Sequence, residues 1–161
     1  MIGVIHKPFL KQTIWAWVGH GRSKIPNPIT NIDEIHSRPT KIIVSLSHAG
    51  DVKQLAEEAF EKPEIVAAGG AGYKSLEVAK NEVDAYLHYT AIKKWDICAG
   101  NALLKQMGGK MTDLLGNGID YFYPDSKQTG VKLKTGLLAT LRDHDYILKK
   151  LRKRGDLVPG S

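Results

Sequence analysis

Along residues 41–154, short apolar strands alternate with segments of helical periodicity. Such an alternation requires crossover connections, which predicts an α/β domain whose sheet is mostly parallel and flanked by helices. The expected strands are Lys41–Leu46, Glu64–Ala68, Asp84–Thr90 and Thr135–Leu141, and the expected helices are Asp51–Lys62, Tyr73–Glu82, one within Lys93–Gly109, and Asp143–Arg154. In addition, residues 110–123 have the pattern of a strand, a Gly-Asn-Gly turn and a second strand.

The beginning of the chain follows a different pattern. Met1–Phe9 and Thr13–Gly21 read as two strands of a β-hairpin. An isolated hairpin is barely stable in water and needs a sheet to join, and no partner strand is evident before it, so we expect its partner strands to lie outside this chain. The expected organisation is therefore a hairpin and linker at residues 1–38, an α/β domain at 39–154 and a tail at 155–161.

Composition limits the classes of function. The 161 residues are 42% hydrophobic and 25% charged, which is typical of a globular domain, and no apolar run approaches the roughly 20 residues that span a bilayer. The net charge of +6 favours anionic partners such as phosphates and nucleotides. A nucleic-acid-binding protein is disfavoured because its aromatic residues are sparse and not interleaved with the basic ones. The single cysteine, Cys98, excludes an internal disulfide and is expected to be a small buried helix residue.

Three loops are expected to leave the carboxyl ends of the strands, where ligands bind in sheets of this kind. They are Ser45–Gly50, Gly69–Lys74 and Ile92–Asp96. They carry hydroxyl groups, an imidazole, a glycine-rich turn, lysines and a carboxylate. If the strands are neighbours, we expect these groups to converge on one crevice.

The glycine-rich loop has two interpretations of equal weight. Gly69, Gly70 and Gly72 precede a helix, so backbone N–H groups could approach a phosphate, and Lys74 could add a full positive charge. Alternatively, the glycines only serve a tight turn that needs a positive φ. The pattern is neither that of a dinucleotide-binding loop nor that of a Walker loop.

The first loop is less informative. The hydroxyls of Ser45 and Ser47 could bind a ribose or a phosphate, and His48 could stack on a base. In the simpler interpretation, Ser47 caps the next helix and His48 is merely exposed. The residues alone favour the simpler interpretation.

Asp96 is the one acidic residue of the third loop. As a helix cap or first-turn residue it would stabilise its helix by about 1 kcal/mol. As a magnesium ligand it would be incomplete, since Mg²⁺ takes octahedral oxygen coordination. The structural role is therefore favoured unless further ligands come from elsewhere. We expect its neighbour Trp95 to pack in the core.

The stretch "KKWDICAGNALLKQMGGKMTD" resembles the carboxyl-terminal signature of the inositol monophosphatase superfamily: Trp-Asp, small residues, a helix, Gly-Gly and Thr-Asp. The segments "GVIHKPF", "SLSH" and "AGGAGYK" extend the resemblance from Met1 to about Lys150. The resemblance implies a Mg²⁺-dependent phosphomonoesterase that removes the 3′-phosphate of 3′-phosphoadenosine 5′-phosphate, with inositol phosphates as alternative substrates. It also implies inhibition by lithium and a location in the Golgi lumen; a homodimer is left open.

The resemblance assigns roles to five residues. Asp96 would bind the metal and contact the substrate. Ser45, His48, Gly70 and Lys74 would contact the nucleotide. It places no catalytic residue in this chain.

The chain also departs from the family pattern. The upstream Glu and the Asp-Pro-Ile/Leu-Asp-Gly/Ala-Thr motif, which supply the other metal ligands, are not found; residues 27–33, "NPITNID", echo the motif but lack its first aspartate. We therefore expect the carboxyl-terminal half of the layered α/β sugar-phosphatase fold, inactive alone. The resemblance also implies that the hairpin at residues 1–38 is a remnant of the amino-terminal antiparallel-sheet domain. The alternative is a nucleotide- or phosphate-binding module without catalysis.

Overall fold

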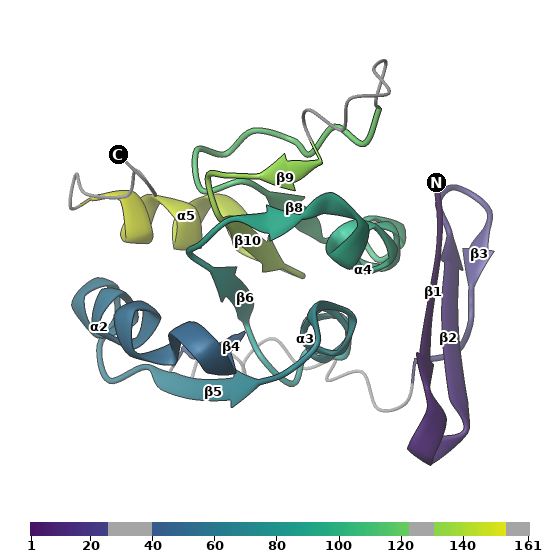
Figure 1. Cartoon of the computed structure of the whole chain (residues 1–161), viewed down its shortest axis with the longest axis horizontal. Coiled ribbons are helices and arrows are strands. Elements are labelled where there is room, and N and C mark those ends of the chain that lie inside the picture. The colour runs from purple at the N-terminus through teal and green to yellow at the C-terminus, as the bar shows by residue number, and fades with distance from the viewer. Residues whose placement is uncertain (26–39, 123–130, 154–161) are drawn as a thin grey trace.

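The fold is built around a five-stranded mixed sheet with helices on both faces (Figure 1). The computed structural model describes residues 1–25, 40–122 and 131–153, without the side chains of residues 48–51. The strand order is β5 (Glu64–Ala68), β4 (Lys41–Ser45), β6 (Ala85–His88), β10 (Leu137–Thr140) and β8 (Lys110–Thr112). β5, β4 and β6 are parallel, whereas β10 runs antiparallel to β6 and β8. The expectation of a mostly parallel sheet therefore holds for one half of it.

Among the described residues, four helices cover this sheet, two on each face. α2 (Ala49–Ala59) and α5 (His144–Arg152) cover one face, and α3 (Ala71–Ala79) and α4 (Lys94–Gln106) cover the other. The strands alternate between two cores: Ile42 and Val44 of β4 pack with α2 and α5, whereas Ile43 packs with α3 and α4. This two-sided burial explains why β4 reads as a continuous apolar run.

The predicted hairpin is confirmed. β1 (Ile2–Lys7) and β2 (Gln12–Trp17) pair antiparallel and are joined through a 3-10 turn, η1 (Pro8–Leu10). A short strand, β3 (Gly21–Arg22), which the sequence did not indicate, pairs with β2. The hairpin stands beside α3 and α4, on the side away from the main sheet (Figure 1).

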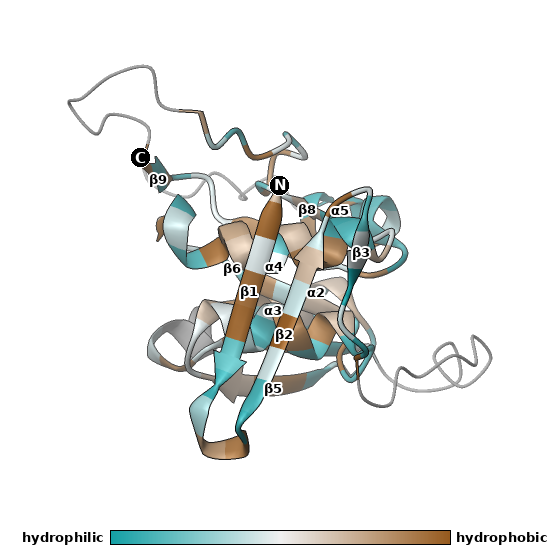
Figure 2. Ribbon diagram, turned by 90° about the vertical axis from the view of Figure 1, so that its right-hand side faces the viewer, coloured by the Kyte–Doolittle hydropathy of each residue, from teal (hydrophilic) through white to brown (hydrophobic). Residues whose placement is uncertain are grey.

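The two faces of the hairpin differ. The inner face buries Ile14 and Ala16 against α4. The outer face, seen in Figure 2, leaves four large apolar side chains more than two-fifths exposed: Ile2, Val4, Trp15 and Trp17.

Close contact between the hairpin and α4 depends on Gly3. A Cβ atom at this position would lie 2.8 Å from Ala99 Cα and 2.9 Å from Ala102 Cβ. Only a residue without a side chain lets β1 approach the helix backbone this closely.

Gly3→Ala is therefore expected to lower the free energy of unfolding by about 1–3 kcal/mol, because the added methyl group overlaps with α4. Gly21→Ala is the matched control, since its Cβ would have only Trp15 at 4.0 Å; its effect should stay within about 0.5 kcal/mol. Urea denaturation of both variants measures the difference. Equal stabilities would show that the hairpin does not depend on this contact.

The region after α4 differs from the prediction. Gly118 makes only an isolated bridge to Thr112, and no second strand follows it within the described residues up to 122. Instead, β7 (Ile92–Lys93) and β9 (Lys132–Leu133), both unpredicted, form a two-stranded ribbon. The segment 27–33 and the tail 155–161 lie outside the described residues.

Candidate functional site

An open cleft of about 750 Å³ lies at the carboxyl ends of β4 and β6 and at the amino-terminal ends of α3 and α4. It brings together four of the five predicted site residues: Ser45, Gly70, Lys74 and Asp96. The fifth, His48, belongs to the 3-10 turn η2 (Leu46–His48) after β4, and its side chain lies outside the described part. The three loops therefore meet, as the strand order requires.

Lys74 contributes a buried positive charge to the cleft. Its side chain belongs to a residue only 3% exposed, and its Nζ donates a hydrogen bond of 3.3 Å to the Ala68 carbonyl oxygen. The same Nζ lies 5.0 Å from the centre of the Tyr86 ring. Burial lowers the pKa of Lys74. No carboxylate of the described residues forms an ion pair with it, so the cleft contains an ammonium group without an acidic partner there.

The amino terminus of α3 also faces the cleft. Gly70 precedes the helix with φ 77°, and no side chain caps the helix there. Ala71 and Gly72 of the first turn line the cleft, and the first N–H groups of a helix have no partner within it. The glycine-rich loop thus forms the tight turn with a positive φ, and the interpretation that its N–H groups bind a phosphate stays a prediction.

Asp96 lies in the first turn of α4, at the cleft, and is exposed. It is not the N-cap, which is Lys93, and no side chain caps this helix. Among the residues that the structure describes, Asp96 is the only acidic one that lines the cleft, and they hold no cluster of three metal-ligating side chains. The described residues therefore offer one carboxylate to a divalent cation, and a Mg²⁺ bound there would take its other oxygen ligands from water, from the substrate or from other residues.

Asp113, the aspartate of the Thr-Asp pair, has a structural role. Its carboxylate accepts hydrogen bonds from the backbone N–H of Asn117 at 2.7 Å, from the Asn117 amide and from the Thr135 hydroxyl. These bonds hold the turn after β8, so the carboxylate is already occupied.

Two predictions about neighbours of Asp96 are wrong. Trp95 is 55% exposed and lines the cleft, with Lys93 Nζ 4.8 Å from its ring centre. The buried face of α4 instead begins at Ile97, about 200° around the helix from Trp95. Cys98 is only partly buried.

Two residues that line the cleft, Tyr86 and His88 of β6, were not predicted from the sequence. The Ser45 hydroxyl lies 3.1 Å from His88 Nδ1, and the Thr90 hydroxyl lies 3.1 Å from His88 Nε2, so both ring nitrogens have partners. Because side chains alternate along a strand, Tyr86 and His88 project to the same face of the sheet. This alternation, next to a strand that ends in Ser45, was the signal that could have found them.

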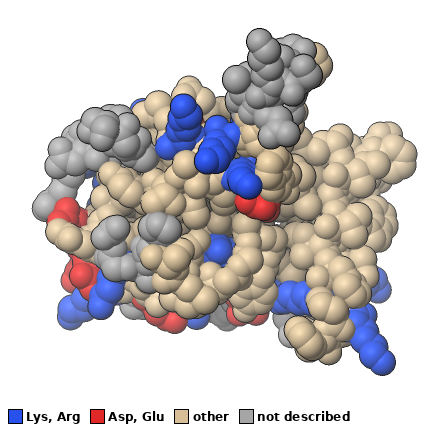
Figure 3. Space-filling model, in the orientation of Figure 1, with Lys and Arg blue, Asp and Glu red and all other residues tan. Residues whose placement is uncertain are grey.

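Charge on this side of the molecule is mixed but mainly positive. In Figure 3, Lys and Arg side chains gather near the middle of the face shown, with acidic atoms directly beside them. Lys93 and Lys132 of the small ribbon line the cleft in addition to Lys74. This arrangement favours an anionic ligand over a cationic one.

The chain is similar to known proteins of one family. The family model described as "Inositol monophosphatase family" matches residues 1–153. "Inositol monophosphatase 3" of Danio rerio is 45% identical over 94% of this chain and 43% of its own length, and "Golgi-resident adenosine 3',5'-bisphosphate 3'-phosphatase" of Homo sapiens is 42% identical over 94% and 41%. This chain therefore spans less than half the length of these relatives.

A solved structure shows the same fold. It is described as "IMPase/NADP phosphatase complexed with Mg2+ and phosphate". It matches 96% of this chain and 55% of its own length with a TM-score of 0.70 and 23% sequence identity.

Proposed function

Because the chain belongs to the inositol monophosphatase family, we propose that it supplies the phosphate-binding part of a Mg²⁺-dependent phosphomonoesterase. The observation that supports this most strongly is the pairing of Lys74 with the uncapped amino terminus of α3 in one cleft. Both attract an anion, and a phosphate offers the acceptor oxygens that they require. Asp96, in the same cleft, would be the metal ligand.

The metal site would be shared. Asp96 would supply one carboxylate, and the other ligands would come from outside the described residues. A bound Mg²⁺ would offset the charge of the phosphoryl oxygens and lower the pKa of a bound water molecule. The described residues of this chain bind and orient the phosphorylated ligand.

The proposed substrate is 3′-phosphoadenosine 5′-phosphate, which water would hydrolyse to AMP and phosphate. Support comes from the name of the human relative and from a cleft of about 750 Å³, within the range typical of small-molecule sites. The polar groups of Ser45 and Gly70 and the exposed ring of Trp95 offer contacts for a ribose, a phosphate and a base. Inositol phosphates are the alternative substrates.

The lone carboxylate favours a second candidate function. If Asp96, the one carboxylate that the described residues bring to the cleft, stays without further metal ligands, then Lys74 and the α3 amino terminus would bind the nucleotide without hydrolysing it.

The proposed cellular compartment is the Golgi lumen, and the proposed assembly is a homodimer. The Golgi lumen is supported by the name of the human relative. Among the described residues, none of the helices combines the length and apolar character needed to cross a bilayer. A homodimer stays a prediction.

A phosphate-release assay separates the two functions. The 161-residue chain is expected to bind AMP but to release no phosphate from 3′-phosphoadenosine 5′-phosphate, because its described residues bring a single carboxylate to the cleft and the other metal ligands are expected from elsewhere. A version extended at its amino terminus with the part of the human relative that this chain does not match should release phosphate when Mg²⁺ is present. Inactivity of a folded extended version would refute the enzyme. Mg²⁺-dependent release by the 161-residue chain would refute the shared metal site.

A further inference from the structure

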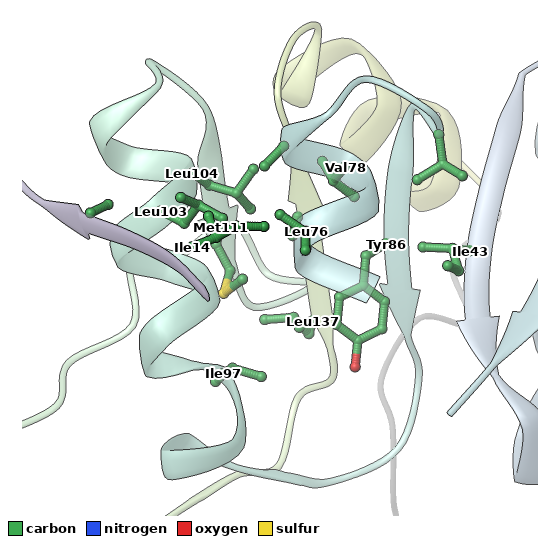
Figure 4. Close-up of a cluster of buried hydrophobic side chains, with 14 of the residues drawn as sticks. Ile14, Ile43, Leu76, Val78, Tyr86, Ile97, Leu103, Leu104, Met111 and Leu137 are labelled. Carbon is green, nitrogen blue, oxygen red and sulfur yellow. The ribbon is translucent and has the colours of Figure 1, made fainter. Parts of the chain in front are cut away.

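Tyr86 lines the cleft, and its hydroxyl group is buried and unpartnered among the described residues. Tyr86 is 0% exposed, and its hydroxyl has no hydrogen-bond partner among the described residues. The ring packs in the core with Leu76 and Leu137, and in Figure 4 its oxygen points away from the labelled cluster of apolar side chains. A buried polar group without a partner destabilises the folded state, so most such groups in folded proteins have a partner or a function.

Neighbouring groups do not satisfy this hydroxyl. The Ser45 hydroxyl is close, but it lies 3.1 Å from His88 Nδ1 and makes no hydrogen bond of normal geometry with Tyr86. Three other buried side-chain groups lack partners in the described residues, on Ser75, Thr140 and Arg142, and none of these residues lines the cleft. Tyr86 is the one whose residue does.

The protonation state makes Tyr86 a donor. Burial raises the pKa of the Tyr86 hydroxyl, and the negative charge of Asp96 raises it further, while Ser45 acts in the opposite direction. The phenol therefore keeps its proton at neutral pH. A phenol without a bonded acceptor can donate to any ligand oxygen that reaches it.

The surroundings select an anionic acceptor. Lys74 Nζ lies over the Tyr86 ring, 5.0 Å from its centre, and the first turn of α3 faces the same cleft. Residues that line one cleft therefore carry an ammonium group, backbone N–H groups of a helix terminus and a phenol, all of which can donate to an oxyanion.

We propose that the Tyr86 hydroxyl donates a hydrogen bond to an oxygen of the phosphorylated ligand that binds beside Lys74. This inference rests on the proposed function and adds a ligand-binding residue to it. In the ligand-free protein the unpartnered hydroxyl lowers the free energy of unfolding, and a hydrogen bond to the bound ligand would remove this penalty. Tyr86 would thus strengthen binding and weaken the free fold.

Tyr86→Phe tests this trade-off because it removes only the hydroxyl and keeps the ring. Isothermal titration of the 161-residue chain with AMP and with inorganic phosphate should show a dissociation constant raised about 10-fold or more, the usual loss for a hydrogen bond to a charged group. The melting temperature of the ligand-free variant should equal or exceed that of the parent. Tyr73→Phe is the matched control: Tyr73 is 42% exposed and does not line the cleft. It should change neither quantity.

Other outcomes overturn the inference, and they differ from a failure of the proposed function. If Tyr86→Phe binds AMP as tightly as the parent, the hydroxyl serves a water molecule and not the ligand. If the melting temperature of ligand-free Tyr86→Phe falls below that of Tyr73→Phe, the hydroxyl has a structural partner. If the folded parent binds neither AMP nor phosphate, the inference and the proposed ligand class both fail.

Discussion

Replacing Asp96 by Asn is expected to reduce Mg²⁺-dependent phosphate release by a factor of about 10²–10³ or more in the amino-terminally extended version. The amide keeps the shape of the side chain but removes the negative charge that would hold the cation. Charge stabilisation by a metal ion is worth several kcal/mol, and each 1.36 kcal/mol corresponds to a tenfold change in rate. Turnover of 3′-phosphoadenosine 5′-phosphate at several Mg²⁺ concentrations is the measurement.

The fold of this variant should persist. Asp96 is exposed, and no side-chain hydrogen bond caps the amino terminus of α4, so the helix should lose less than about 1 kcal/mol of favourable charge–dipole interaction. Asp120→Asn is the matched control, because Asp120 is also exposed and accepts a local hydrogen bond from the Phe122 N–H. Similar turnover in the two variants would remove Asp96 from the metal site.

Replacing Lys74 by Met is expected to weaken AMP binding by about 100-fold or more while stabilising the ligand-free protein. Burial lowers the pKa of Lys74 below its usual 10.5, so the folded state binds the proton less tightly than the unfolded state does. The parent should therefore gain stability as pH rises from the lowered folded pKa toward 10.5, and keep the full cost of the buried charge below that window. The Met variant has no such cost, and its stability should lack this rise.

Calorimetry with AMP and urea denaturation across alkaline pH measure both effects. Lys53→Met is the matched control, because the Lys53 side chain is 60% exposed and forms only a surface ion pair with Glu57. Its affinity and pH profile should match those of the parent. A Lys74→Met variant with parental AMP affinity would remove Lys74 from the phosphate site, and one with an unchanged alkaline profile would contradict its buried charge.

Much of the fold follows from local patterns. The segment Glu64–Ala68 was predicted with the bounds that β5 has, because it is a β-branched run between a proline and glycines. The short ribbon of β7 and β9 was not predicted, since two-residue strands have no periodicity to recognise. The direction of β10 also escaped prediction: its pairing with β6 and β8 is long-range and leaves no local mark.

The candidate site shows the same division. Ser45, Gly70, Lys74 and Asp96 could be predicted to lie in one cleft, because they lie at or after the ends of predicted strands and belong to recognisable motifs. Tyr86 looked like an ordinary strand residue, since its role depends on which strand lies beside β6. The prediction that Trp95 is buried failed because burial on α4 depends on the position of its neighbours, which a single helix does not reveal.

The position of α4 links the hairpin to the cleft. The helix carries Asp96 in its first turn, contacts β1 where Ala99 lies against Gly3, and contacts α3 where Gly100 lies against Ser75. At both contacts a glycine lets the neighbouring element approach the helix without room for a side chain, so α4 has little freedom to shift alone. A displacement of the hairpin would consequently move α4 and with it the Asp96 carboxylate. Substitutions in the hairpin, remote from the cleft, could therefore change the position of Asp96.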